Sequence, residues 1–355
     1  MQDADASSRA CDVREQIVDQ AIGIVVIGRN EGSRLERCLR SVVGQAATVV
    51  YVDSGSDDGS TEFARALGVS VIDLDTSIAF TAARARNAGL TLLRELQPGL
   101  QFVQFLDGDC EVEKDWLAKA ISELRECAEL AVVFGRRRER AREVSPYNRI
   151  CDLEWDVPAG SVLSCGGDAM MRSEALTQVG GYDANLIAGE EPDLCLRMRG
   201  EGWQIRCVDA PMTVHDADMH RWSQWWLRSV RAGYVEAEGV AMRGKDYPRY
   251  RAALSNVFWS IVVPLLGVLT ISWSLWLGSL LVAGLAIGLF AAAYVFLWRR
   301  IAVGARQRWP RSDARLYATS CMLGKWPSMQ GMIVYWWRRL LRRDRSLIEY
   351  KQDES

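Results

Sequence analysis

The chain has 355 residues, a formal net charge of -2 at pH 7 and a hydrophobic content of 49%. This length fits one large domain or two smaller ones, and the near-neutral charge gives no support for nucleic-acid binding. The nine cysteines contain no CxxC pair, and their odd number favours a reducing, cytosolic setting. Residues 1–20 are polar and acidic and lack the basic and apolar regions of a signal peptide, so we expect a loose tail there.

The first hundred residues alternate between apolar runs of strand length and amphipathic stretches of helical period. Strands that alternate with helices imply parallel pairing through right-handed crossovers, and ligands of such sheets bind at the carboxyl ends of the strands. The pattern predicts an α/β fold with strands at 22–27, 48–52, 69–74 and 102–106, and with helices at 33–43, 61–67 and 81–96.

The last of these strands ends in two carboxylates that flank a glycine. Residues i and i+2 of a strand point to the same side, so Asp107 and Asp109 can reach one ion together, and Gly108 leaves room beside the backbone. Oxygen ligands of this kind suit Mg²⁺ or Mn²⁺. The same residues also suit a turn that ends a strand. Asn30 and Asp53 follow two other strands and are expected at the same sheet edge, whereas neither GxGxxG nor GxxxxGK[ST] occurs.

Several segments, taken together and in order, resemble the family 2 glycosyltransferases of the GT-A fold. The resemblance implies a Rossmann-like, mostly parallel sheet flanked by helices over residues 21–250, which binds a nucleotide-sugar and transfers the sugar to an acceptor. The segments are VVIGRNEG (25–32), VVYVDSGSDDGS (49–60), ARNAGL (85–90), FLDGD (105–109), GGDAMMR (166–172), GGYD (180–183) and GEEPDLCLR (189–197).

The resemblance also implies which residues bind the donor. Asp53 would face the nucleotide base, although its carboxylate could instead cap an Asx turn. Asn30 and Glu31 would line the nucleoside pocket. Arg86 would lie near the diphosphate and offset charge on the leaving group, unless it belongs to the solvated face of a helix. Asp168, in the segment GGDAMMR, would contact the donor or the acceptor.

By the same resemblance, a divalent metal, Mg²⁺ or Mn²⁺, is the expected cofactor. Asp107 would lie near the ribose and the metal, and Asp109 would bind the metal directly. His215 follows a predicted last strand that leads back toward the site, where several members of the fold use a histidine as a further ligand. His220 is the weaker candidate, and either histidine could instead lie on the surface.

Glycosyl transfer needs a group that removes the proton of the acceptor hydroxyl, and carboxylates often serve as that base. Members of the family carry an acidic pair, usually Glu-Asp, before a helix, and this chain has Glu190-Glu191-Pro192-Asp193 there. Glu191 aligns with the usual aspartate and is the predicted base. Glu190 and Asp193 are the alternatives, because a glutamate reaches one methylene further than an aspartate. The other interpretation is that these acids only stabilise the start of a helix.

Residues 221–231 interleave tryptophans with arginines at helical spacing. This pattern predicts a helix near 220–240 that lies at the membrane interface. Arg228 and Arg231 could meet a diphosphate of the substrate or the acceptor. The run 136–143 is dense in charge, and we interpret it as solvated, with acceptor-phosphate binding as the alternative.

The stretch 252–298 contains no charged residue and is long enough for two membrane passes, at 255–272 and 274–298 with a turn at 272–274. Arginines and a lysine lie at both outer ends and none lies at the turn, which puts both ends in the cytoplasm. We therefore predict a transmembrane hairpin at 251–300. A buried hairpin in a soluble protein is the alternative.

Residues 301–355 return to amphipathic character and are rich in arginine and tryptophan. Pro327 is expected to divide them into two basic juxtamembrane helices, which would anchor the chain at the interface.

Together these features predict a multi-pass protein of the inner, cytoplasmic membrane whose catalytic domain faces the cytoplasm. It would be a hexosyltransferase-type enzyme of bacterial-type polysaccharide or glycolipid biosynthesis. The donor would be UDP- or GDP-linked, the acceptor a saccharide or, more simply, lipid-linked, and the mechanism inverting by resemblance. A homo-oligomer stays open, since two passes cannot form a channel alone. A nucleotidyltransferase and a non-catalytic membrane scaffold with a degenerate binding module are the alternative functions.

Overall fold

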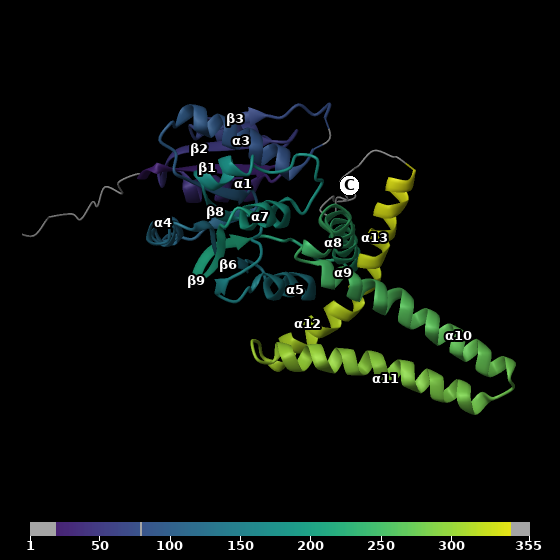
Figure 1. The fold of residues 1–355 in the computed structure, drawn as a ribbon. Coiled ribbons are helices and arrows are strands. Elements are labelled where there is room, and N and C mark those ends of the chain that lie inside the picture. The colour runs from purple at the N-terminus through teal and green to yellow at the C-terminus, as the bar shows by residue number, and fades with distance from the viewer. Residues whose placement is uncertain (1–18, 79, 342–355) are drawn as a thin grey trace, which may run out of the picture.

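The structure is a computed structural model that describes residues 19–78 and 80–341. Most of the tail predicted at 1–20, and the part of the basic C-terminal segment after residue 341, lie outside the described residues. Figure 1 shows a domain built on a sheet, from which a long helical hairpin extends to one side. The chain then returns toward the domain along its last two helices.

The first half of the sheet domain confirms the predicted alternation of strands and helices. Parallel pairing aligns Ile27 with Asp107 and Gly28 with Asp53, so the ends of three strands meet at one sheet edge. The amphipathic helix predicted after the first strand is α1, and its apolar residues Leu35, Cys38, Leu39 and Val42 are buried. The elements are β1 (Asp19–Gly28), α1 (Ser33–Val42), β2 (Ala46–Asp53), α2 (Ser60–Ala66), β3 (Ser70–Asp73), α3 (Ala82–Leu96) and β4 (Phe102–Asp107).

The second half of the domain makes the sheet mixed. The strand order is β3-β2-β1-β4-β8-β6-β9-β5, with β7 beside β9. β8 runs antiparallel to both of its neighbours, β4 and β6, whereas β6 and β9 are parallel. The elements are β5 (Cys110–Val112), α4 (Trp116–Glu126), β6 (Leu130–Glu139), α5 (Pro146–Trp155), β7 (Gly160–Ser161), β8 (Ala169–Arg172), α6 (Ser173–Gln178), α7 (Glu190–Gly200) and β9 (Gln204–His215).

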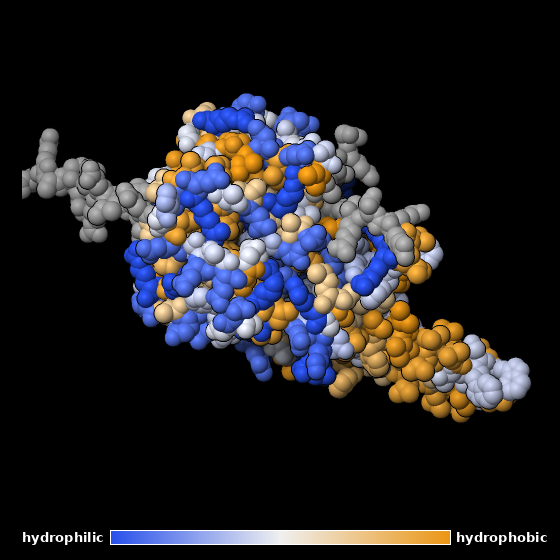
Figure 2. Space-filling view, turned by 45° about the horizontal axis from the view of Figure 1, so that its top comes forward, coloured by the Kyte–Doolittle hydropathy of each residue, from blue (hydrophilic) through white to orange (hydrophobic). Residues whose placement is uncertain are grey.

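The charge-free stretch forms two helical segments, Tyr250–Trp276 and Leu280–Ala305, that are long and apolar enough to cross a membrane. Figure 2 shows a band of hydrophobic residues along this hairpin. Only 17% and 11% of their most apolar windows are buried, which disfavours the alternative of a buried hairpin in a soluble protein. The first segment joins α9 (Tyr250–Val257), a π-helical turn η2 (Phe258–Val262) and α10 (Val263–Trp276), and the second is α11.

Two details of the hairpin differ from expectation or refine it. The turn lies at Gly278, which has a positive φ of 73°, rather than at 272–274. Gly278 fits this conformation because it carries no side chain. The π-helical turn directly precedes Pro264, whose missing N–H cannot continue regular helical bonding. The first segment therefore contains a widened turn just before this proline.

The predicted interfacial helix is α8 (Trp222–Arg243), and it ends in the short turn η1 (Gly244–Asp246). The C-terminal segment forms α12 (Arg311–Leu323) and α13 (Lys325–Leu340), as two helices, but the break is at Gly324. Pro327 lies in the first turn of α13, where a missing N–H costs little. α13 packs along α8 and covers one side of it. Trp222, at the start of α8, is exposed.

Two glycines permit the close crossing of α8 and α13. A Cβ added at Gly233 would overlap the carbonyl of Ser328, and one added at Gly331 would overlap the carbonyl of Val230. Backbone atoms cannot yield as a flexible side chain can. The two helices therefore touch along their main chains at this point.

We expect Gly233→Ala to lower the thermal unfolding temperature, because overpacking typically costs about 1–3 kcal/mol. Gly284→Ala is the matched control, since a Cβ there would meet open space. Thermal unfolding of both variants in the same detergent compares them. Equal unfolding temperatures would contradict the close crossing.

Candidate active site

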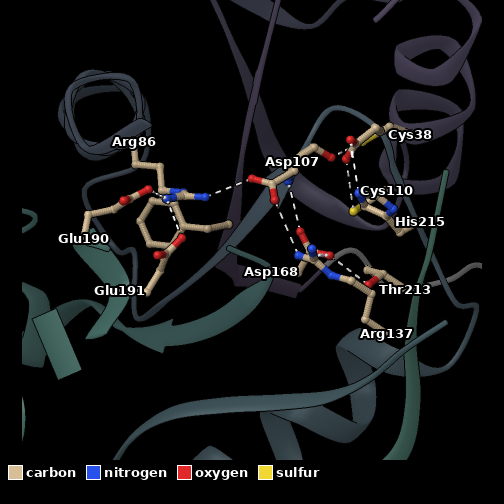
Figure 3. A network of polar contacts seen from close by, with 12 residues as sticks. Cys38, Arg86, Asp107, Cys110, Arg137, Asp168, Glu190, Glu191, Thr213 and His215 are labelled. Atoms are coloured by element: carbon tan, nitrogen blue, oxygen red, sulfur yellow. Dashed lines mark hydrogen bonds and ion pairs between the residues drawn. The ribbon is translucent and has the colours of Figure 1, made fainter. Parts of the chain in front are cut away.

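The candidate site lies where β4, β6, β9 and the start of α7 converge, around the Asp107-Gly108-Asp109 segment. Figure 3 shows Asp107 between Arg86, Glu190 and Glu191 on one side and Asp168, Arg137, Thr213 and His215 on the other. One group of side chains at the site is Asp109 with His215, and the other is Arg86 with Glu190 and Glu191. The sheet edge predicted from sequence is therefore the place where these side chains meet.

Sheet register brings Asp109 and His215 together. Cys110 pairs with His215 across β5 and β9, which places Asp109 beside the imidazole. Asp109 Oδ2 lies 3.2 Å from His215 Nε2. Glu139 pairs with His215 across β6 and β9, and its Oε2 lies 3.4 Å from His215 Nδ1. The ring of Trp155 packs edge-on against the imidazole, with centroids 4.5 Å apart.

The pKa of His215 reflects these carboxylates. Burial alone would lower it, but Asp109 and Glu139 raise it above the ordinary 6.5. A cluster of carboxylates around a buried imidazole attracts positive charge, whether that charge is a proton or a cation.

This group has the donor set of a divalent-cation site. The ligand atoms of Asp109, Cys110 and His215 all lie within 4.8 Å of one another. Burial raises the pKa of the Cys110 thiol well above 9.0, so it stays protonated and is a poor ligand. A carboxylate and an imidazole remain, and Glu139 lies behind the imidazole as carboxylates do in many metal sites. The residues fit a metal held by Asp109 and His215.

The second group is built on the buried guanidinium of Arg86, whose side chain is 3% exposed. Nη1 donates to Glu190 Oε1 at 2.6 Å and to Glu191 Oε1 at 2.9 Å, and Nη2 donates to Asp107 Oδ1 at 2.9 Å. The ring of Tyr182 lies below the guanidinium, 5.5 Å from its carbon. Arg86 thus lies inside the site and not on a solvated helix face.

The acids at the start of α7 differ in their surroundings. Burial and the neighbouring Glu190 raise the pKa of Glu191 to about 7, although Arg86 opposes the shift. Asp193 instead accepts hydrogen bonds from Arg197 and from Arg243, at 2.8 and 2.7 Å. Both oxygens of Asp193 are therefore occupied by arginines, so Asp193 is the least available of the three to contact an acceptor.

Asp168 and Arg137 fix the position of Asp107. Asp168 Oδ1 accepts from the Asp107 backbone N–H at 3.0 Å, and Oδ2 accepts from Thr213 at 2.8 Å. Arg137 Nη2 lies 2.8 Å from Asp168 Oδ2 and 3.5 Å from Asp107 Oδ2. Burial raises the pKa of Asp107, but Arg86 and Arg137 outweigh it and lower that pKa below 3.8. Asp168 is therefore bonded to Asp107, Thr213 and Arg137, and its contact with the donor or the acceptor stays a prediction.

The residue directly before Asp168, Gly167, lies against the charged side chains of the site. A Cβ built there would lie 2.6 Å from both Arg86 Nη2 and Asp107 Oδ2. Only glycine lets the chain pass so close to these two charged groups.

The residues predicted for the nucleoside lie at the ends of β1 and β2. Asp53 Oδ2 accepts from the backbone N–H groups of Gly55 and Ser56, both at 2.8 Å, and Oδ1 accepts from Tyr51 at 2.8 Å. Its carboxylate therefore stabilises its own turn, which was the alternative interpretation. Asn30 has a positive φ of 53° and accepts from the Asp57 N–H at 3.0 Å. Glu31 pairs with Arg34 at 2.8 Å.

Two other predicted residues lie in different surroundings. Arg228, on α8, pairs with Glu154 of α5 at 2.6 Å. His220 is exposed and lies 2.8 Å from Asp218. The metal-type group is therefore built on His215, and a diphosphate contact by Arg228 or Arg231 stays a prediction.

Arg137, Glu139 and Trp155 contact the site but were not predicted for it. Arg137 and Glu139 belong to the charged run 136–143, which was interpreted as solvated. In fact their side chains are 14% and 0% exposed, whereas those of Arg136 and Arg138 are 38% and 52% exposed. This alternation of exposure has the period of a strand, but the run is charged at every one of these positions, so the sequence carries no sign of it.

The chain is similar to known glycosyltransferases in both sequence and fold. Residues 23–177 match the family model described as "Glycosyl transferase family 2". This part of the chain is a family 2 glycosyltransferase domain. A solved structure, the mannosyltransferase PcManGT from Pyrobaculum calidifontis in complex with GDP-Man and Mn²⁺, has a TM-score of 0.52 at 18% identity. It covers 91% of this chain and 88% of that chain, and shows that the fold is that of a GT-A glycosyltransferase.

Curated relatives are also glycosyltransferases or biosynthetic proteins. The pre-mycofactocin glycosyltransferase of Mycobacterium tuberculosis is 28% identical over 239 residues, which are 63% of this chain and 48% of that protein. The succinoglycan biosynthesis protein ExoA of Rhizobium meliloti is 25% identical over 208 residues, 54% of this chain and 62% of that protein. The chain thus spans about half the length of the mycobacterial relative. The family 2 domain contains Asp53, Arg86, Asp107 and Asp109, while Glu191 and His215 follow it.

Proposed function

We propose that this chain is a membrane-anchored, metal-dependent glycosyltransferase that moves a sugar from a nucleotide-sugar to a lipid-linked acceptor. The observation that carries the proposal is the meeting of Asp109 and His215 with Glu190 and Glu191 on opposite sides of Asp107, in a GT-A fold. One group suits a cation and the other suits proton transfer. An inverting transfer from a nucleotide-sugar can use both, the cation at the leaving diphosphate and the base at the acceptor hydroxyl.

The metal side would hold the donor's diphosphate. Asp109 and His215 would be the protein ligands, with Glu139 orienting the imidazole, and Asp107 would lie beside the metal and the ribose. A bound divalent cation would supply charge that stabilises the departing nucleoside diphosphate. A site that combines a carboxylate with an imidazole favours a transition-metal ion such as Mn²⁺ over Mg²⁺. The solved structure of PcManGT is described as a complex with Mn²⁺.

The acidic side would supply the base. Glu191 would take the proton of the acceptor hydroxyl, whose oxygen attacks the anomeric carbon as the bond to the diphosphate breaks. One such displacement inverts the anomeric centre. A pKa of about 7 leaves Glu191 partly ionised near neutral pH and basic enough to accept the proton. Arg86 would hold Glu190 and Glu191 in place and link them to Asp107.

The hairpin supports a lipid-linked acceptor. Its exposed apolar helices would hold the domain at a membrane, and positive residues at both outer ends favour a cytoplasmic location for the domain. We assign the chain to the inner membrane of a bacterial-type cell, in polysaccharide or glycolipid assembly.

Turnover should rise with pH through about 7. A raised pKa keeps Glu191 protonated at lower pH, where it cannot accept a proton, and frees it above about 7. The measurement is kcat between about pH 5.5 and 8.5 under saturating donor and metal. A flat profile over this range would contradict Glu191 as the base.

The function is tested by a donor screen. The purified full chain is incubated with Mn²⁺, membrane extract and single UDP- or GDP-sugars, and the released nucleotide is identified. Release of nucleoside diphosphate that depends on one donor and on the extract is the expected result. In a parallel reaction with nucleoside triphosphates in place of the nucleotide-sugars, release of pyrophosphate would instead indicate a nucleotidyltransferase. Failure of every donor to bind with Mn²⁺ present would support a non-catalytic scaffold.

A further inference from the structure

A cavity lies away from the active site, where the hairpin meets the rest of the protein. Its volume is about 580 Å³, and its walls come from α9, η2, the end of α11, α12 and the start of α13. On the hairpin side its lining is apolar, with Trp259, Phe296 and Leu297. Toward the sheet domain it is lined by the cations Arg300, Arg308 and Lys325. The cavity is therefore amphipathic, with its charge at the end where membrane helices would leave the bilayer.

Of the three cations, Lys325 gives the strongest indication that the cavity binds an anion. It is half-buried, and its Nζ donates to the hydroxyl of Ser255 at 2.9 Å. Among the described residues, no carboxylate lies within ion-pair distance of it. Burial lowers its pKa. An ammonium removed from water without a carboxylate partner is costly, and an anion in the cavity would relieve that cost.

The charge of the cavity indicates the kind of anion. Arg308 pairs with Asp156, with Nη2 to Oδ2 at 3.3 Å, which cancels one positive charge. Arg300 and Lys325 leave about two positive charges facing the cavity, a match for a phosphate monoester or diphosphate rather than a singly charged diester.

We infer that this cavity binds the phosphate monoester or diphosphate headgroup of a membrane lipid, with Arg300, Arg308 and Lys325 around the phosphate and the lipid chain along Trp259, Phe296 and Leu297. The inference rests on the proposed function, because it gives the lipid-linked acceptor a site on the protein. The phosphate would lie at the level of the lipid headgroups, where the hairpin enters the bilayer.

The cavity is connected to the metal side of the active site. Trp309 lines the cavity and donates from Nε1 to Asp156 Oδ2 at 2.7 Å. Asp156 follows Trp155, whose ring packs against His215. One wall of the cavity thus holds the segment that borders the predicted metal ligand, so the cavity adjoins the metal side of the active site.

Binding of farnesyl phosphate tests the inference without any donor. The full chain is placed in phosphatidylcholine nanodiscs, and the dissociation constant is measured for farnesyl phosphate, for farnesol and for inorganic phosphate. We expect farnesyl phosphate to bind about tenfold more tightly than either other probe. Nanodiscs that contain phosphatidylglycerol should compete only weakly, because a diester carries less charge.

Matched variants locate the site. Arg300→Gln and Lys325→Gln are each expected to weaken farnesyl phosphate binding about tenfold, because each removes a charge-assisted contact. Arg299→Gln is the control, since Arg299 is the exposed neighbour of Arg300 and does not line the cavity. Arg300 is exposed, so its variant should fold even if that of Lys325 does not.

Equal weakening by Arg299→Gln and Arg300→Gln would overturn the site. Equal affinity for farnesol, inorganic phosphate or phosphatidylglycerol would overturn the assignment to a lipid phosphate monoester. Because no nucleotide-sugar is present, these results are independent of the donor screen. A chain that binds farnesyl phosphate here but uses no donor would disprove the proposed function and leave the lipid site standing.

Discussion

Asp109→Asn is expected to lower kcat for sugar transfer by about a hundredfold or more, because a metal bound at a developing charge contributes several kcal/mol to the transition state. Asparagine keeps the size of the side chain but loses the charge that balances a cation. Mn²⁺ affinity, measured by titration of the free ion, should fall in parallel.

Glu111→Gln is the matched control for Asp109→Asn. Glu111 lies two residues further along the chain and pairs with Arg140 outside the site. It should keep normal turnover and Mn²⁺ binding. If purified, folded Asp109→Asn turns over at a near-normal rate, Asp109 is not a metal ligand that the reaction needs.

Glu191→Gln is expected to lower kcat by about two to four orders of magnitude, the usual contribution of a positioned general base. Glutamine keeps a hydrogen bond to Arg86 but cannot accept the acceptor's proton. The KM for the donor should change little, because Glu191 would act on the acceptor. The rise of turnover with pH should also disappear in the residual activity.

Glu190→Gln and Glu201→Gln complete that comparison. Glu201 lies at the far end of α7 and bonds to Gln178, so its variant should be normal. Near-normal turnover in Glu191→Gln, together with a large loss in Glu190→Gln, would move the base to Glu190.

The alternation of strands and helices was readable from sequence because local periods determine it. β1, β2 and β4 bury apolar residues, β3 packs partly buried ones against the same core, and their parallel order follows from the crossovers. The antiparallel direction of β8 was not readable, since pairing with β4 and β6 depends on contacts between residues far apart in the chain. The turn at Gly278 was also missed, because a uniformly apolar run gives little signal of where it reverses.

The site divides in the same way. The motif around Asp107 and Asp109 placed both carboxylates correctly at the sheet edge, and His215 followed from its position at the end of the last strand. The inward faces of Arg137 and Glu139 depend on β6 being a strand along its full length. A charge-rich segment does not suggest this, although charges that pair inside a site can be buried there.

The most direct test of the account follows both halves of the donor. The full chain is given Mn²⁺, membranes and the nucleotide-sugar identified by the screen, with one radiolabel in the nucleoside and another in the sugar. The account predicts that the sugar label moves into the lipid extract while the nucleoside label stays in water as the diphosphate, and that Asp109→Asn largely abolishes both conversions. Nucleoside label in the lipid extract, or sugar transfer that Asp109→Asn leaves intact, would contradict it.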